Sequence, residues 1–321
     1  VDSCSSRHAD IRERILVALI QVHADHPSLP IMERSQRADG EIPVLHASLR
    51  SAGRLLVGTL AALAVVVGTW AADTPAVRIT YLYDNSAASP GAESQWGFAA
   101  LVEAHGKRVL FDTGGSADVF RRNIQALKVD LGQLDALVLS HEHWDHTNGI
   151  ATLGRREGLP VYFPGSAAQW APFRTALAAA GMKAVPVTEV TRIAPGIAVS
   201  HEMKSSLVPE VALMIDTDDG LVVLVGCSHP GADAMLKQVR DRTGRPILMI
   251  VGGFHMLDFS ADQIKHTLDE FKALGVRYVG PTHCTGDPAI TSAFNAFPGA
   301  FIQGGVGTVV EAAPFSRQVL P

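Results

Sequence analysis

The chain has few cysteines, few aromatic residues and no cluster of positive charge. Three cysteines in 321 residues do not follow the spacing of a small disulfide scaffold. A formal net charge of −5, without any run of Lys and Arg, argues against binding to a nucleic-acid backbone. The chain does have a hydrophobic fraction of 47%, which is enough to fill a sizeable core. Composition therefore predicts a globular enzyme and excludes nucleic acid as a partner.

The segment over residues 48–72 has the pattern of a secretory signal peptide. Arg50 and Arg54 precede an apolar run over residues 55–67, and small residues follow at 68–72. The run is short for a membrane span, which needs about twenty residues. An uncleaved membrane anchor is the alternative, because residues 68–72 could extend the apolar helix. In both cases we expect the catalytic part to be exported, to the periplasm or the medium, with no membrane contact once the signal is cleaved.

Residues 1–47 precede this predicted signal, although a signal is expected near the N-terminus. We therefore expect translation to start naturally at Met32 or later, and we assign no function to residues 1–47. The predicted catalytic domain covers residues 73–321.

The most informative stretch is His141-Glu142-His143-Trp144-Asp145-His146. It follows a short apolar run over residues 134–139, which is typical of a buried strand. In the loop after such a strand, His141 and His143 can face one point while Asp145 and His146 reach a second point nearby. Two divalent cations could then be held together. Imidazole and carboxylate donors favour Zn²⁺, with Mn²⁺ or Fe²⁺ as alternatives. A polar loop with histidines placed by chance does not explain this spacing.

From residue 77 onward, predicted strands and helices alternate. The first half contains predicted strands at 79–83, 96–103, 108–111 and 159–163, with helices at 116–127 and 167–180. The second half contains predicted strands at 211–215, 221–225, 246–251 and 276–279, with helices at 232–243 and from Ser260. Two β-rich halves flanked by helices predict an α/β fold, a four-layer αββα sandwich with ligands on loops at one edge of the sheets.

The hexapeptide resembles the first metal motif of the metallo-β-lactamase superfamily, and other segments match that superfamily in the same order. They are the Asp-Thr-Gly turn within residues 108–115 and the stretches 226–231, 252–255 and 282–286. The last three resemble the subgroup labelled 7,8-dihydropterin-6-methyl-4-(β-D-ribofuranosyl)aminobenzene-5′-phosphate synthase-like. The resemblance covers about residues 77–311 and implies the metallo-β-lactamase fold, a four-layer αββα sandwich.

Further ligands are predicted in the second half. His229 and His283 each follow a predicted strand in a glycine-containing turn, as the first motif does. The resemblance then favours two metal ions. One is assigned His141, His143 and His229 as ligands, and the other Asp145, His146 and His283.

Two cysteines adjoin these ligands. Many enzymes of the superfamily have a bridging Asp where Cys227 stands, which leaves open how the two metals are bridged. Cys227 and Cys284 form either a disulfide or a pair of free thiols near the metals.

His255 and Asp112 complete the predicted site. His255 follows a predicted strand and two glycines, so we expect it in the same pocket. Three roles are open for His255: contact with the substrate, binding of a metal, or support of another metal ligand. The superfamily counterpart of Asp112 lies behind the metals and orients an imidazole, whereas a simple turn residue is the alternative.

The predicted function is hydrolysis of an ester, lactone, amide or phosphoester of a small molecule by a metal-bound hydroxide. Asp145 would orient the water, and His255 would stabilise the charge that develops on the substrate. The subgroup implies an alternative, a synthase that joins a pterin to an aromatic amine, which export disfavours because such precursors are cytoplasmic. A non-catalytic secreted binding protein is the third possibility, and the oligomeric state is left open.

Overall fold

The computed structural model describes residues 77–166 and 170–312, which belong to one compact unit, Gly68–Pro321. The predicted leader and signal peptide lie outside the described residues. Among the residues that are described, no helix combines the length and the hydropathy that a membrane span requires.

The first sheet has seven strands in the spatial order β13-β1-β2-β3-β4-β5-β6. They are β1 (Val77–Tyr83), β2 (Ala99–Ala104), β3 (Lys107–Phe111), β4 (Ala136–Val138), β5 (Pro160–Pro164), β6 (Lys183–Val187) and β13 (Val309–Ala312). Strands β1 to β3 form the predicted antiparallel meander, and β3 to β6 are parallel. The carboxyl ends of these parallel strands meet at one edge of the sheet, where the His141 motif follows β4.

The second sheet has six strands in the order β12-β11-β10-β9-β8-β7. They are β7 (Thr191–Ala194), β8 (Ile197–Val199), β9 (Leu213–Thr217), β10 (Gly220–Val225), β11 (Ile247–Gly253) and β12 (Tyr278–Thr282). A hairpin joins β9 to β10, and the Thr217 hydroxyl donates a hydrogen bond of 2.6 Å to the Gly220 carbonyl. Strands β10, β11 and β12 are parallel, so the segments that follow them come together.

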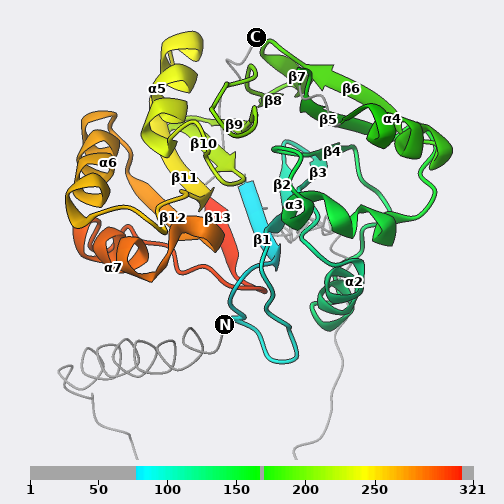
Figure 1. The fold of residues 1–321 in the computed structure, drawn as a ribbon, viewed down its shortest axis with the longest axis horizontal. Coiled ribbons are helices and arrows are strands. Elements are labelled where there is room, and N and C mark those ends of the chain that lie inside the picture. The colour runs from blue at the N-terminus through cyan, green and yellow to red at the C-terminus, as the bar shows by residue number, and fades with distance from the viewer. Residues whose placement is uncertain (1–76, 167–169, 313–321) are drawn as a thin grey trace, which may run out of the picture. The chain divides into compact units, whose positions relative to one another are not determined.

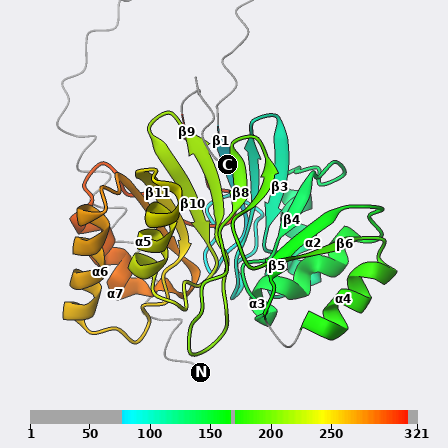
Figure 2. The same ribbon diagram turned by 90° about the horizontal axis from the view of Figure 1, so that it is seen from above.

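Helices cover the outer face of each sheet, as Figures 1 and 2 show. Beside the first sheet lie α2 (Ala117–Ala126), α3 (Trp144–Thr147), the 3-10 turn η1 (Asn148–Leu153) and α4 (Trp170–Ala179). Beside the second lie α5 (Ala232–Thr243), α6 (Ala261–Ala273), η2 (His283–Thr285) and α7 (Asp287–Ala296). The chain therefore has the predicted four-layer αββα architecture.

Alternation of side chains along the strands creates three apolar cores. In β9, Leu213 and Ile215 face the core between the sheets, whereas Met214 faces the helices. A third core lies between the first sheet and its helices and includes Phe120 and Phe163. Because both faces of the central strands are buried, they are continuous apolar runs in the sequence.

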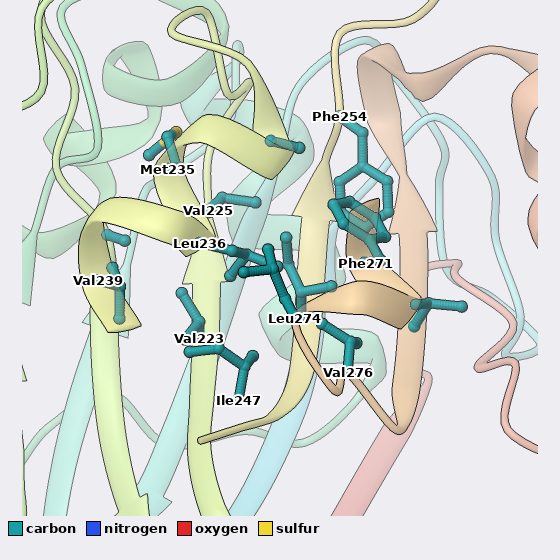
Figure 3. Packing of buried hydrophobic residues seen from close by; sticks show 14 of the residues in the cluster. Val223, Val225, Met235, Leu236, Val239, Ile247, Phe254, Phe271, Leu274 and Val276 are labelled. Carbon is teal, nitrogen blue, oxygen red and sulfur yellow. The ribbon is translucent and has the colours of Figure 1, made fainter. Parts of the chain in front are cut away.

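The core beneath α5 and α6 is shown in Figure 3. Phe254 and Phe271 pack edge to face, with ring centroids 5.4 Å apart. A capping box opens α6 at the predicted start, Ser260, since the Ser260 and Gln263 side chains each bond the other residue's backbone. Full burial of an aromatic ring is worth several kcal/mol to folding, so this cluster anchors the helices behind the site.

Two parts of the prediction differ from the structure. The strand expected from Trp96 begins only at Ala99, because Gly97 adopts a φ of 138° and Trp96 is exposed. Strands β6 to β8, helix α7 and β13 were not predicted. Strands β6 and β7 are partly exposed edge elements, and their sequences lack a continuous apolar run.

Candidate metal centre

The first motif begins just beyond β4. His141 is fully buried, and its Nε2 lies 3.1 Å from Nδ1 of His143. His143 stands at the N-terminus of α3, which places Asp145 and His146 in the single turn of that helix. Asp145 Oδ2 lies 3.8 Å from Nε2 of His146. The compact loop therefore turns all four side chains toward one small volume.

The second half of the chain supplies the remaining predicted ligands. His283, at the end of β12, places its Nε2 3.3 Å from both His146 Nε2 and Asp145 Oδ2. His229, beyond β10, has its ring centroid 4.8 Å from the ring centroids of His141 and His143. The structure thus brings together the six side chains that the sequence analysis singled out as ligands.

Cys227 lies between the two groups of donors. Its sulfur is 3.2 Å from His146 Nε2. It belongs to one potential metal-binding set with Asp145, His146 and His283, and to another with His141 and His229. Cys227 and Cys284 are both free and buried. Of the two interpretations of this pair, the structure has the free thiols.

A hydroxyl and a carboxylate stand behind the first motif. Asp112 accepts hydrogen bonds from Nδ1 of His146 at 2.7 Å and from the Ser140 hydroxyl at 2.7 Å. Ser140 Oγ lies 2.9 Å from Nδ1 of His141. Asp112 therefore orients an imidazole, which is the role expected of its superfamily counterpart.

Glu210 has the same function for His229, which the sequence analysis missed. Its fully buried carboxylate accepts hydrogen bonds from Nδ1 of His229 and, at 2.8 Å, from the Ser228 backbone N–H. Glu210 lies inside the fold, whereas Leu207, earlier in the same loop, is exposed. A glutamate just before a buried strand was the available signal, but only the fold shows what it contacts.

Asn85 and Asp84, directly after β1, hold His283 and were also missed. Asn85 Oδ1 lies 3.1 Å from Nδ1 of His283, and the Asn85 amide donates to the His283 carbonyl at 2.9 Å. The Asp84 carboxylate accepts from the His283 backbone N–H at 3.3 Å. Side chains of other residues therefore hold His141, His146, His229 and His283 from behind, and of these Ser140, Asp112 and Glu210 are fully buried.

These contacts test whether the residues fit a divalent cation. One nitrogen of each of those four rings is held from behind, so the other faces the centre and offers a lone pair to a cation once it carries no proton. Two such lone pairs repel each other at 3.3 Å, the separation of the His146 and His283 Nε2 atoms. Nitrogen ligands of one tetrahedral zinc are about 3.3 Å apart for bonds near 2.0 Å. The donor set therefore fits Zn²⁺ or a similar ion.

Burial and neighbouring charges shift the pKa values of the donors. Burial, together with the surrounding histidines, holds the pKa of His141 well below its usual value. Burial would also lower the pKa of His146, but the adjoining Asp112 carboxylate outweighs it and raises that pKa to about 9. For Asp145, burial opposes ionisation, whereas the hydrogen bond with His283 and the nearby histidines dominate and lower the pKa. The carboxylate is thus available as an anionic ligand.

His255 lies beside the centre. Its ring centroid is 4.5 Å from that of His229, and its backbone φ of 50° is in the left-handed region, which non-glycine residues seldom adopt. A hydrogen bond with Cys284 raises the pKa of His255. Strained backbone of this kind is common where a fold fixes a functional side chain. The geometry places His255 where it can reach either a substrate or a cation.

Exposed aromatic rings flank the same site. Trp96 is 40% exposed, and its ring centroid lies 4.8 Å from that of His283. Trp144, between His143 and Asp145, is 55% exposed. A Cβ at Gly115 would lie 2.6 Å from the Trp144 ring and 2.9 Å from the Trp96 carbonyl, so this glycine lets the two tryptophans approach each other.

Comparisons with known proteins agree with this architecture. The family model of the metallo-beta-lactamase superfamily matches residues 97–283, more than half of the chain. A solved structure, Tm1679, described as a metal-dependent hydrolase of the beta-lactamase superfamily, is 30% identical with a TM-score of 0.63. That match covers 74% of this chain and 99% of the other.

Two further similarities are informative. The 7,8-dihydropterin-6-methyl-4-(beta-D-ribofuranosyl)-aminobenzene-5′-phosphate synthase of Methanocaldococcus jannaschii is 28% identical, over 60% of this chain and 82% of that protein. The metallo-beta-lactamase fold protein YhfI from Bacillus subtilis is 19% identical, with a TM-score of 0.55 over 73% of this chain and 99% of the other, which shows the fold alone. On the family match and the Tm1679 similarity, the chain belongs to the metallo-beta-lactamase superfamily.

Proposed function

We propose that this protein is a metal-dependent hydrolase that holds two divalent cations, most favourably Zn²⁺, and cleaves an ester, lactone, amide or phosphoester of a small molecule. The observation that carries the proposal is the convergence of six donor side chains from three segments, those that follow β4, β10 and β12. Side-chain partners, three of them fully buried, position four of the imidazoles from behind. A donor set supported in this way is characteristic of a functional metal site.

Two cations bound there would polarise a substrate oxygen and lower the pKa of a coordinated water from 15.7 to about 7. The chain's own groups supply the positioning. Asp145 is ionised and faces His283, so one of its oxygens can hold the attacking water in line with the substrate. His255 can donate a hydrogen bond to the oxygen on which negative charge develops, because its raised pKa favours the protonated ring.

Trp96 and Trp144 support a substrate that carries an apolar or aromatic group. Together with Leu257, which is 50% exposed two residues after His255, they are large apolar side chains exposed near the predicted ligands. Aromatic rings of this kind bind flat or apolar groups by stacking and by excluding water. We therefore expect aryl or alkyl-substituted esters and lactones to be better substrates than small, highly charged ones.

The experiment that tests the proposal uses the purified full chain loaded with Zn²⁺. Hydrolysis would be measured against esters, lactones, amides, phosphodiesters and β-lactams. We expect the protein to hydrolyse at least one of these substrate classes, and we expect a metal chelator to abolish that activity. Failure to hydrolyse any of them at full metal occupancy would reject the hydrolase function.

A pterin-dependent synthase is the second candidate, because one relative carries that name at 28% identity. Two assays distinguish the candidates: the kcat and metal content of the His255→Ala variant, and the substrates that the wild-type enzyme requires. In a hydrolase, loss of this donor should lower kcat by about 10²- to 10³-fold with metal retained. Activity that requires a pterin and an arylamine together would instead establish the synthase, and loss of metal in proportion to activity would make His255 a ligand.

We also propose that the protein is exported, on the basis of the basic, apolar and small residues over 48–72. N-terminal sequencing of the mature protein should find a start near Ala72 or Asp73. Recovery of soluble protein from the cytoplasm with residues 48–72 still attached would contradict export.

A further inference from the structure

We propose that the Cys227 thiolate is a ligand shared by the two cation positions, in place of the bridging carboxylate of many related enzymes. This inference rests on the proposed two-metal centre. It assigns a chemical role to a residue that departs from the superfamily pattern, and it changes the character of the centre from nitrogen and oxygen donors to a set that includes sulfur.

The end of β10 lies unusually close to the first motif. A Cβ at Gly226 would lie 2.0 Å from Ser140 Oγ and 3.1 Å from His141 Nδ1, so only glycine permits this approach. On the other side, a Cβ at Gly253 would lie 2.5 Å from the Gly226 carbonyl. The backbone before Cys227 is therefore fixed between two neighbouring segments, and the next side chain enters the centre.

The position of the sulfur suits a shared ligand. One set of donors contains Asp145, His146 and His283, and the other contains His141 and His229. Cys227 is the member common to both sets, with all donor atoms of each set within 4.8 Å of one another. Its sulfur lies 3.2 Å from His146 Nε2. Nitrogen and sulfur ligands of one zinc are about 3.5 Å apart, for bonds of about 2.0 and 2.3 Å.

Cys284 is the matched control for Cys227. Like Cys227, Cys284 is buried. Its thiol donates to the Cys227 carbonyl at 3.6 Å. The Cys284 sulfur also packs against Gly253, since a Cβ added at Gly253 would lie 2.6 Å from it. The donor sets around His229 and His283 do not include it, and it shares a set only with Cys227 and His255. Cys284 lies outside both sets of predicted ligands, so removing its thiol should leave the shared ligand in place.

A sulfur ligand has a consequence for metal preference. Thiolates favour Zn²⁺ over Mn²⁺, whereas carboxylates suit Mn²⁺ better. Cys227→Asp should restore the usual bridging carboxylate and lower the preference for Zn²⁺ over Mn²⁺ by at least tenfold. Cys284→Ser should leave that preference unchanged.

Cobalt replacement tests the assignment directly in the full chain. Apoprotein would be titrated with Co²⁺, and its absorption recorded together with the amount of bound metal. We expect two equivalents bound and a thiolate-to-cobalt charge-transfer band in the near ultraviolet. Cys284→Ser should keep this band, whereas Cys227→Ser and Cys227→Asp should lose it, with Cys227→Asp still binding two equivalents.

The outcomes separate this inference from the proposed function. Two equivalents bound without the band, or a band that only Cys284→Ser removes, would overturn the role of Cys227 and leave the two-metal centre standing. Failure of the wild-type chain to bind cobalt or zinc would overturn both. If Cys227→Ser does not fold, X-ray absorption spectroscopy of the zinc-loaded wild-type and Cys284→Ser proteins decides. Ligation by Cys227 requires a sulfur atom at about 2.3 Å from zinc in both proteins.

Discussion

At the scale of single residues, the centre is built from pairs in which one side chain points into the site and a second side chain holds the first from behind. His146 rests on Asp112, and His229 rests on Glu210. The outer partner selects which ring nitrogen carries the proton and so leaves the other free to bind. Metal affinity should therefore depend on residues that never touch the metal.

Glu210→Gln tests this dependence with little change in shape. The amide cannot accept from His229 and Ser228 as a carboxylate does, so we expect Zn²⁺ affinity to fall by about 10- to 100-fold. Competition with a chromophoric chelator would measure it. Glu202→Gln is the control, because Glu202 bonds Ser166 at the surface instead. Equal zinc affinities for the two variants would show that Glu210 does not support the centre.

Asp145→Ala should lower kcat by at least about 10²-fold while the circular dichroism spectrum stays unchanged. In the proposed mechanism the carboxylate binds a cation and positions the water, and its short helix lies outside the three apolar cores. Asp118→Ala removes an exposed carboxylate from the first turn of α2 and should behave as wild type. Undiminished turnover of Asp145→Ala at full metal occupancy would exclude this role.

The sequence allowed some of these residues to be predicted and not others. His141, His143, Asp145 and His146 are recognisable because they stand within six positions and follow an apolar run. Glu210 and Asn85 form no pattern with the histidines that they hold. Their roles arise from contacts between segments that are far apart in the chain, so only the folded structure reveals them.

At the scale of elements, every predicted ligand lies just beyond a strand or in the short helix that follows it. The turns require unusual backbone, since Asp112, Ser228 and His283 all have positive φ. Rigid sheets thus fix the start of each loop, and tight turns aim the side chain. These loops should therefore tolerate few added atoms at positions where backbone segments pack closely.

Gly149→Ala tests this packing. An added Cβ would lie 1.8 Å from the carbonyl oxygen of Thr113, whose backbone N–H and hydroxyl both donate to the His146 carbonyl. We expect the free energy of unfolding to fall by about 1–3 kcal/mol, because overpacking forces the backbone to move. Urea denaturation of the metal-free protein would measure it. Ala151→Ser, on an exposed position of the same 3-10 turn, is the control, and equal stability of both variants would refute the close-packing argument.

Elements with strong local patterns were predicted well. Strand β10 is a continuous apolar run and α6 opens with a capping box, so both could be identified. Strand β6, in contrast, has two exposed and two half-buried residues and contains Pro186. Its pairing with β5 depends on the sheet already being present, and no local signal indicates it.

At the scale of the whole molecule, the centre joins the two halves of the sandwich. His141 to His146 follow a strand of the first sheet, and Cys227, His229 and His283 follow strands of the second. The proposed cations, bound between these segments, would link the two sheets at one edge. A ligand that binds only the folded state stabilises it by mass action.

Metal removal should therefore lower the melting temperature. Free Zn²⁺ at 100 times its dissociation constant adds about 2.7 kcal/mol per site, which corresponds to roughly 5–10 °C for a domain of this size. Calorimetry with and without a chelator would measure the shift. A variant with both His229→Ala and His283→Ala should show no such shift, and an unchanged melting temperature in the wild type would mean that no cation stabilises the fold.

The central claim is that hydrolysis depends on two cations held between the halves. Stepwise addition of Zn²⁺ to the metal-free full chain, with the hydrolysis rate recorded at each step, tests it most directly. The account predicts no turnover without metal and a rate that reaches its plateau at two equivalents. A full rate in the metal-free protein, or a plateau already reached at one equivalent of zinc, would contradict the claim.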